Sequence, residues 1–203
     1  MAVSLVVLLS SNVFYCIAAG VADSSTLRVR DELLTYQANG RLPMPIVWQS
    51  IQQELLDAST LMPYAPQYNE GQGYLFALRG ISALRFKELA LPNLKNAELN
   101  YRLAIIKRPM TSSNWANLAL VSYYADSSRV ADIDRLSDDA MRFGPVDYAT
   151  QISLFYLGML RWDNLSMLRR AQVELALKNA KEPLKTKLKE VAHQFNKNQL
   201  PNN

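Results

Sequence analysis

The sequence predicts an all-α protein in which an N-terminal transmembrane helix precedes a short solenoid of antiparallel helical hairpins. Only seven of the 203 residues are glycine, and leucine, alanine and long charged side chains are abundant, which favours helices over a β-sandwich or barrel. Apolar residues recur at helical spacing, and no strand pattern competes. An alanine is followed five residues later by a proline at Ala58, Ala104 and Ala140. Since small residues let helices approach closely and prolines end them, this pattern predicts stacked hairpins.

Residues 1–22 contain no charged side chain, and Asp23 is the first charge in the chain. About 20 apolar residues are needed to span a bilayer, so this segment is predicted to be a single-pass transmembrane helix or an uncleaved signal anchor. A cleavable signal peptide is the alternative, with Gly20 and Ala22 as the small residues before the cut. A helix buried in the core is the third interpretation.

The orientation of the predicted span stays open. No lysine or arginine precedes the apolar run, whereas Arg28 and Arg30 follow it closely. By the positive-inside rule, these arginines would hold the following domain on the cytoplasmic side. A start codon farther upstream, with a basic leader, would explain the missing charge.

Helix-start and helix-stop signals predict the elements of the first half of the chain in order. They are a helix over 27–38 that Ser25 or Thr26 caps and Asn39-Gly40 ends, a helix from about Val47 that stops before Pro63, a helix over about 67–90, and a helix that Pro92 opens and Pro109 ends.

The second half of the chain divides in the same way. The expected helices run from Ser112 or Ser113 through Ser122, from Val130 to Phe143 before Gly144-Pro145, from Val146 to Trp162, from Asn164 or Ser166 to near Lys181, and from Pro183 through Phe195. As domains, we expect a span at 1–22, a linker with a short helix at 23–45, a repeat domain at 46–182, and a basic helix with a frayed tail at 183–203.

The spacing of small and aromatic residues resembles the tetratricopeptide repeat, in which paired helices recur about every 34 residues. In sequence order, the first four matching positions correspond to the second helix of one repeat, and the next three correspond to the first helix of the following repeat. After a two-residue insertion, two further positions match the end of that repeat, and the last one matches the start of a third. These packing positions are Ala97, Tyr101, Ala104, Pro109, Trp115, Leu118, Ala119, Ala140, Pro145 and Gly158. The resemblance implies two to three degenerate repeats.

A second resemblance concerns short stretches of sequence between residues 27 and 182. They are Tyr101-Arg102, Ala104-Ile105, Arg108-Pro109, the run from Trp115 to Ala119, Gly144-Pro145 and Gln151. The chain here resembles the VpsP family, small membrane-anchored proteins of bacterial exopolysaccharide and exosortase-type gene clusters, and the repeat tails of some O-antigen ligase-like proteins. The resemblance implies a role in polysaccharide assembly or export at the bacterial inner membrane, with the repeat domain in the periplasm.

The sequence offers little that is typical of an enzyme. Its single histidine, His193, lies in a basic helix with no nucleophile motif nearby, and its single cysteine, Cys16, lies in the apolar N-terminal segment. The aspartates of the helix over 130–143 alternate with arginines, which predicts a salt-bridged surface before a cation site. We therefore expect no catalytic residues, no metal, no cofactor and no nucleic-acid partner.

The net charge is +4, and from Arg161 to Lys197 nine lysines or arginines face four acidic residues. A solvated helix surface is the first interpretation of this basic region, and attraction to an acidic partner or to anionic lipid is the second.

In the repeat register, the first helix of each hairpin lines a concave groove. Aromatic residues in such a groove can hold a partner peptide or stack on a sugar ring. The candidate groove residues are Tyr123, Tyr124, Phe155, Met159 and Trp162. The alternative is that these side chains only pack neighbouring helices.

We therefore expect a non-catalytic, membrane-anchored scaffold or adaptor in exopolysaccharide biosynthesis. Its partners would be proteins of the assembly machine and, as an option, a glycan. One alternative is a protein-interaction subunit of a secretion or pilus machine. Another is an accessory subunit that activates a membrane glycosyltransferase.

Overall fold

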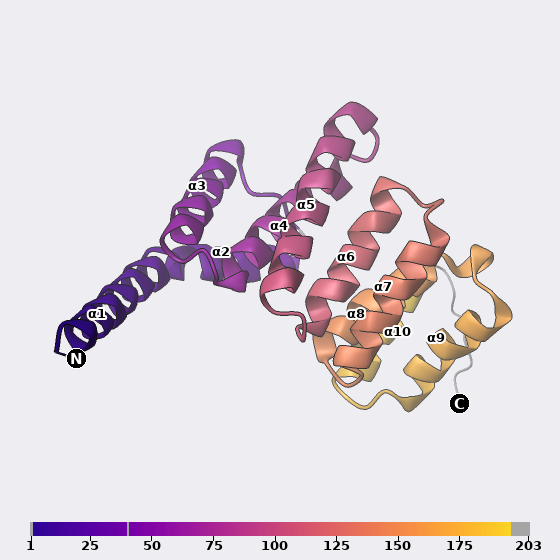
Figure 1. The fold of residues 1–203 in the computed structure, drawn as a ribbon. Coiled ribbons are helices and arrows are strands. Elements are labelled where there is room, and N and C mark those ends of the chain that lie inside the picture. Colours follow the sequence, from indigo (N-terminus) through magenta and orange to yellow (C-terminus); the bar gives the residue numbers. More distant parts are fainter. Residues whose placement is uncertain (1, 40, 196–203) are drawn as a thin grey trace. The chain divides into compact units, whose positions relative to one another are not determined.

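The computed structural model describes residues 2–39 and 41–195, and all regular elements in these ranges are helices. The predicted all-α class is confirmed. The elements in chain order are α1 (Ala2–Ser25), α2 (Leu27–Asn39), α3 (Pro45–Leu61), α4 (Pro66–Ser82), α5 (Lys87–Lys107), α6 (Ser112–Ala125), α7 (Val130–Phe143), α8 (Tyr148–Leu160), the 3-10 turn η1 (Trp162–Asn164), α9 (Met167–Asn179) and α10 (Leu184–Gln194) (Figure 1).

The chain divides into two compact units. Unit 1 is Met1–Arg108 and holds α1 to α5, and unit 2 is Pro109–Asn203 and holds α6 to α10. The division lies inside the segment 46–182 that the sequence predicts as one repeat domain.

In unit 1, the C-terminal half of α1 packs against α3 and buries Ala18 and Ala22 in the unit's core. Other side chains of this half of the helix are apolar and exposed, among them Val13, Phe14, Ile17 and Val21.

In the part of the chain that the structure describes, no helix is long and apolar enough to cross a membrane. The transmembrane helix predicted for residues 1–22 is therefore not confirmed. The apolar run of this segment is interrupted by polar residues, namely Ser4, Ser10, Ser11 and Asn12.

The three alanines that lie five residues before a proline, Ala58, Ala104 and Ala140, make the same contacts in the structure. Each is buried near a helix end, and its carbonyl oxygen accepts the last helical hydrogen bond from the backbone N–H of the residue just before the proline. The three donor-acceptor pairs are Met62 N to Ala58 O at 2.9 Å, Arg108 N to Ala104 O at 2.9 Å, and Gly144 N to Ala140 O at 3.1 Å. The spacing in the sequence therefore marks three helix ends.

Unit 2 places α6 beside α8 and pairs α6 with α7 as a hairpin (Figure 1). Neither α6 nor α8 carries a charged side chain, as their sequences show. Polar side chains link the two helices from the first turn to the last. The links are Thr150 Oγ1 to Ser112 Oγ at 2.9 Å, Ser153 Oγ to Asn117 Oδ1 at 3.3 Å, Tyr124 Oη with Tyr156 Oη at 3.2 Å, and Tyr123 Oη to Leu160 O at 3.3 Å.

The predicted helix over 67–90 and the predicted start at Pro92 are both wrong. The chain turns at residues 83–86, between α4 and α5, and Pro92 lies inside α5. The turn forms where α5 packs back along α4, and a Cβ on Gly80 would lie 2.8 Å from Leu94 Cγ. Pro92 is exposed, and its missing N–H removes one bond, to the carbonyl of Glu88, early in the helix.

This close approach gives a stability prediction. Gly80→Ala should lower the free energy of unfolding by about 1–3 kcal/mol, because Leu94 is buried and its Cγ and backbone N cannot both move away. Gly20→Ala is the matched control, since nothing lies within 4 Å of a Cβ at that helical glycine. Urea unfolding followed by circular dichroism would measure both, and equal effects of the two substitutions would contradict the close approach.

Candidate functional site

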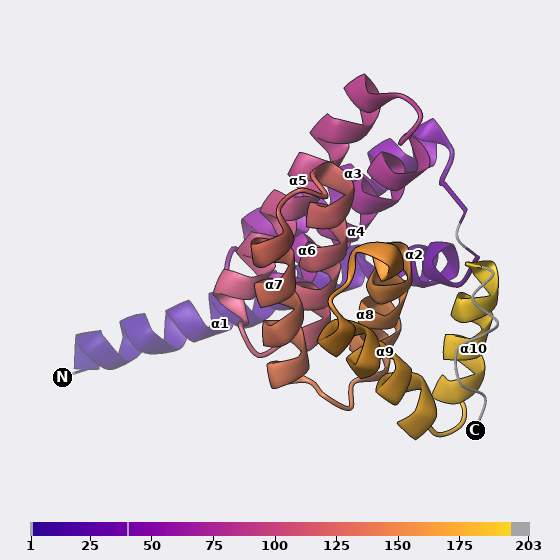
Figure 2. The same ribbon diagram turned by 90° about the vertical axis from the view of Figure 1, so that its right-hand side faces the viewer.

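Unit 2 contains a groove of about 850 Å³. Helix α8 forms its floor through Leu154, Phe155 and Gly158, while α7 and α9 supply its walls. Figure 2 shows α7, α8 and α9 from the side on which α9 crosses in front of α8. The groove ends at residues 179–184, where α9 gives way to α10.

The groove is lined mostly by apolar side chains, and several of them are open to solvent. Val146 is 87% exposed and Leu175 is 53% exposed, while Met141 and Tyr148 are exposed on the same side. Exposed apolar side chains around a concave surface are typical of binding sites for proteins and small molecules.

Gly158 sets how closely one wall approaches the floor. A Cβ at this position would lie 2.6 Å from Val173 Cγ2 of α9, so only glycine fits beneath that side chain. Gly158, the position that the sequence assigns to a third repeat, therefore has a packing role and also lines the groove.

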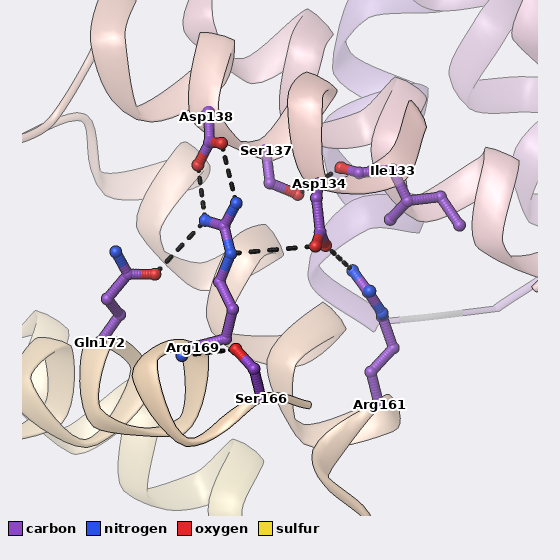
Figure 3. A network of polar contacts seen from close by, with 8 residues as sticks. All are labelled: Ile133, Asp134, Ser137, Asp138, Arg161, Ser166, Arg169 and Gln172. Atoms are coloured by element: carbon purple, nitrogen blue, oxygen red, sulfur yellow. Dashed lines mark hydrogen bonds and ion pairs between the residues drawn. The ribbon is translucent and has the colours of Figure 1, made fainter. Parts of the chain in front are cut away.

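Two arginines from outside α7 pair with two aspartates of that helix at one end of the groove, which we call the arginine end (Figure 3). Arg161, just after α8, is 7% exposed, and its Nη1 donates to Asp134 Oδ1 at 2.7 Å. Arg169 of α9 binds Asp138 with both terminal nitrogens, at 2.5 and 2.8 Å, and its Nε lies 3.9 Å from Asp134 Oδ2. These contacts connect α7 to the end of α8 and to the first turn of α9.

Two neighbouring side chains of α9 and its N-cap also bind Arg169. Ser166 caps α9 by accepting a hydrogen bond from the Arg169 backbone N–H at 3.3 Å, and Gln172 Oε1 accepts from Arg169 Nη1 at 3.3 Å. The Arg169 guanidinium lowers the pKa of Asp138, and Asp138 in turn raises the pKa of Arg169. Both groups therefore stay charged near neutral pH.

Lysines gather at the opposite end of the groove, which we call the lysine end and define by Lys181, Lys185 and Lys189. Lys181 lines the groove beside Glu182, and the other two lysines follow on α10. The pKa of Glu182 is lowered, first by the hydrogen bond from Thr186 Oγ1 at 2.6 Å and further by Lys185 and Lys189.

Of the five groove residues that the sequence predicts, Phe155 is the one that lines this groove. Phe155 and Met159 are both buried in a cluster with α9 and α10. Trp162 packs on that cluster, and its ring lies 5.9 Å from the guanidinium carbon of Arg170.

Tyr123 and Tyr124 lie between α6 and α8 and use their hydroxyl groups to connect the two helices. Burial, together with the hydrogen bond to Tyr156, raises the pKa of Tyr124. These tyrosines pack neighbouring helices, which was the alternative left open by the sequence.

The predicted repeat positions lie at packing contacts in both units. Those buried in the core are Ala97, Tyr101, Ala104, Leu118, Ala119, Ala140 and Gly158. Trp115 stacks on Phe143 at 5.8 Å and donates from Nε1 to the Pro109 carbonyl at 2.7 Å, while Gln151 Nε2 donates to the Pro145 carbonyl at 2.8 Å. Each proline carbonyl thus binds the side chain six residues later.

The arginine end was missed by sequence reasoning. The expected pairing within α7 occurs for Arg135, which binds Asp132 at 2.6 Å and Asp139 at 3.4 Å. Asp134 and Asp138 instead pair with arginines 27 and 31 residues away. The available signal was that these aspartates are four residues apart and share one side of α7.

In the described ranges, no group of three or more histidine, cysteine, aspartate or glutamate residues is placed to hold a metal ion. Cys16 and His193 are exposed. Comparison with protein-family models, curated proteins and solved structures finds no match in any of the three. The resemblances to tetratricopeptide repeats and to the VpsP family therefore stay predictions.

The arginine end predicts an acid-sensitive contribution to stability. Because the pKa of Asp138 is lowered in the folded state, its contribution is present above the unfolded pKa and is lost as the pH falls through the folded value. Asp138→Asn should therefore reduce the loss of unfolding free energy between about pH 5 and about pH 2. Urea titrations across this range would measure it. Asp31→Asn, at an exposed aspartate of α2, is the control, and the same change in both variants would refute the assignment.

Proposed function

We propose that this chain is a non-catalytic scaffold whose unit 2 holds a segment of a partner protein in the groove between α7 and α9. The observation that carries the proposal is the apolar lining with exposed walls, which leaves apolar surface uncovered in the described structure. Covering such surface is the main source of binding free energy between proteins.

The charges at the arginine end favour an apolar residue of the occupant at that end. Asp134 and Asp138 already pair with Arg161 and Arg169, so an entering charge would meet groups that have partners. The stacking of α6 on α8 and the equivalent contacts at Pro109 and Pro145 support the further proposal that the hairpins are degenerate tetratricopeptide repeats.

The resemblance to the VpsP family extends the proposal to the assembly or export of a bacterial polysaccharide. In this setting the groove would hold another protein of the assembly machine. A secretion or pilus machine and a membrane glycosyltransferase stay the alternative settings, because the groove chemistry fits a protein segment of any of them.

A second candidate function follows from α1. Its exposed apolar row (Val13, Phe14, Ile17 and Val21) lies in a segment without any charge up to Asp23. We propose that this row attaches the scaffold to a membrane.

The groove proposal is tested by Leu175→Lys, which places a charge on the groove wall at a half-exposed position. A photoreactive amino acid at Val146 should form a discrete adduct in the native cells, and Leu175→Lys should abolish the adduct and reduce polymer yield. Unfolding temperatures should change little, because the side chain is 53% exposed. Leu99→Lys is the matched control, at a residue of α5 that is 56% exposed. An adduct that survives Leu175→Lys would contradict the proposal.

The α1 proposal is tested by flotation with lipid vesicles. The unmodified chain should float with the vesicles, and Ile17→Asp should lower the ratio of bound to free protein at least about tenfold, because a carboxylate is costly in the hydrocarbon region. Leu34→Asp, at an exposed residue of α2, should have little effect. Failure of the unmodified chain to float would exclude membrane attachment through α1.

A further inference from the structure

The charges around the groove are distributed unevenly. Residues 161–195 hold eight lysines or arginines and four acidic residues. At the arginine end, Arg161 and Arg169 are matched by the aspartates of α7. The excess of positive charge therefore lies at the opposite end of the groove, toward α10.

At the lysine end, three cations share one nearby carboxylate. Lys185 and Lys189 both act on Glu182, whose Oε2 also accepts the Thr186 hydroxyl, and Lys181 is its neighbour in the chain. Lys187 pairs with Glu190 at 2.9 Å and so does not add to this excess. An occupant that reaches the lysine end meets a net positive potential.

The groove also has a direction. Helix α9 carries Arg169 in its first turn and Leu175 and Asn179 toward its end, so its 13 residues extend from the arginine end to the lysine end. At 1.5 Å per residue this wall is about 20 Å long, which matches a helix of about 13 residues. Between the two ends, the floor and walls are apolar.

We propose that the groove binds an acidic amphipathic helix of the partner protein, with its apolar face on α8 and its acidic residues at the lysine end. This inference rests on the proposed function, since it names the chemistry of the segment that the scaffold holds. Amphipathic helices bind apolar grooves through residues spaced three and four apart, and charges at the rim select and orient them. A basic helix would bring like charges together at Lys181.

Two synthetic peptides test the inference with the full chain. Both are labelled 14-residue helices with the same leucine and alanine face, and they differ only in carrying glutamates or lysines on the polar face. Fluorescence anisotropy at low salt should show at least about tenfold tighter binding of the glutamate peptide, and the difference should shrink in about 0.5 M salt as the charges are screened.

Charge-reversal variants locate the effect. The double variant Lys181→Glu and Lys185→Glu should lose or invert the preference for the glutamate peptide. The matched control is Lys87→Glu with Lys95→Glu, at two exposed lysines of α5 outside the groove lining, and it should keep the preference. Leu175→Asn should weaken the binding of both peptides.

The outcomes distinguish a failure of this inference from a failure of the proposed function. If both peptides bind equally and Leu175→Asn weakens both, the proposal that the occupant is acidic is wrong, but the groove is still a binding site. Binding of neither peptide would contradict both proposals. If neither peptide binds while vesicles with phosphatidylglycerol bind only when Lys181 and Lys185 are present, the lysines serve a lipid headgroup and the inference is wrong.

Discussion

Unit 2 depends on the charge of Arg161. Arg161 is 7% exposed, so its guanidinium has lost most of its hydration, and the carboxylate of Asp134 compensates for that loss at 2.7 Å. This pair fixes the end of α8 to α7, and the Arg169–Asp138 pair fixes the start of α9 to the same helix. Three helices are thereby held around one end of the groove. The removal of Asp134 would leave the charge of Arg161 without compensation in a poorly solvated position.

Packing determines the rest of the groove. Because Gly158 has no side chain, Val173 approaches the backbone of α8, and α9 lies close to the floor. On its other side, α8 is held by α6 through polar links that extend from Ser112 to Tyr124. Hydrogen bonds to α6 therefore fix one face of α8, while the other face of α8 forms the apolar floor of the groove. Such a site presents a preformed shape to a partner, which lowers the cost of ordering on binding.

The helix ends were predictable wherever the chain carries its own stop signal. Helix α7 has the predicted bounds, because Asp126 to Ser128 precedes it and Gly144-Pro145 follows it. The turn at residues 83–86 has no proline or glycine, and it forms because α5 packs against α4. Pro92 misled the prediction, because the packing of α5 against α4 outweighs both the lost hydrogen bond and the clash of the proline ring with the carbonyl of Glu88.

The groove itself was harder to predict than the fold. Repeat spacing indicated which residues pack, and Ala104 and Ala140 are indeed fully buried. Repeat spacing placed the groove on the first helices of the hairpins. Phe155 of α8 lines the groove, whereas Tyr123 and Tyr124 join α6 to α8. The pairing of Asp134 with Arg161 depends on how α8 ends beside α7, and local rules for charges three and four residues apart do not contain this information.

The links between α6 and α8 also have a consequence for synthesis on the ribosome. The four polar contacts join residues that are 32 to 38 positions apart. At about 5–20 residues per second, α6 therefore waits for about 2–8 s before its partners in α8 have been made. During that interval α7 is the helix of unit 2 that has already been made and can pack on the uncharged α6. The nascent chain is thus most exposed to misassembly, and most in need of chaperones, between the completion of α7 and the arrival of α8.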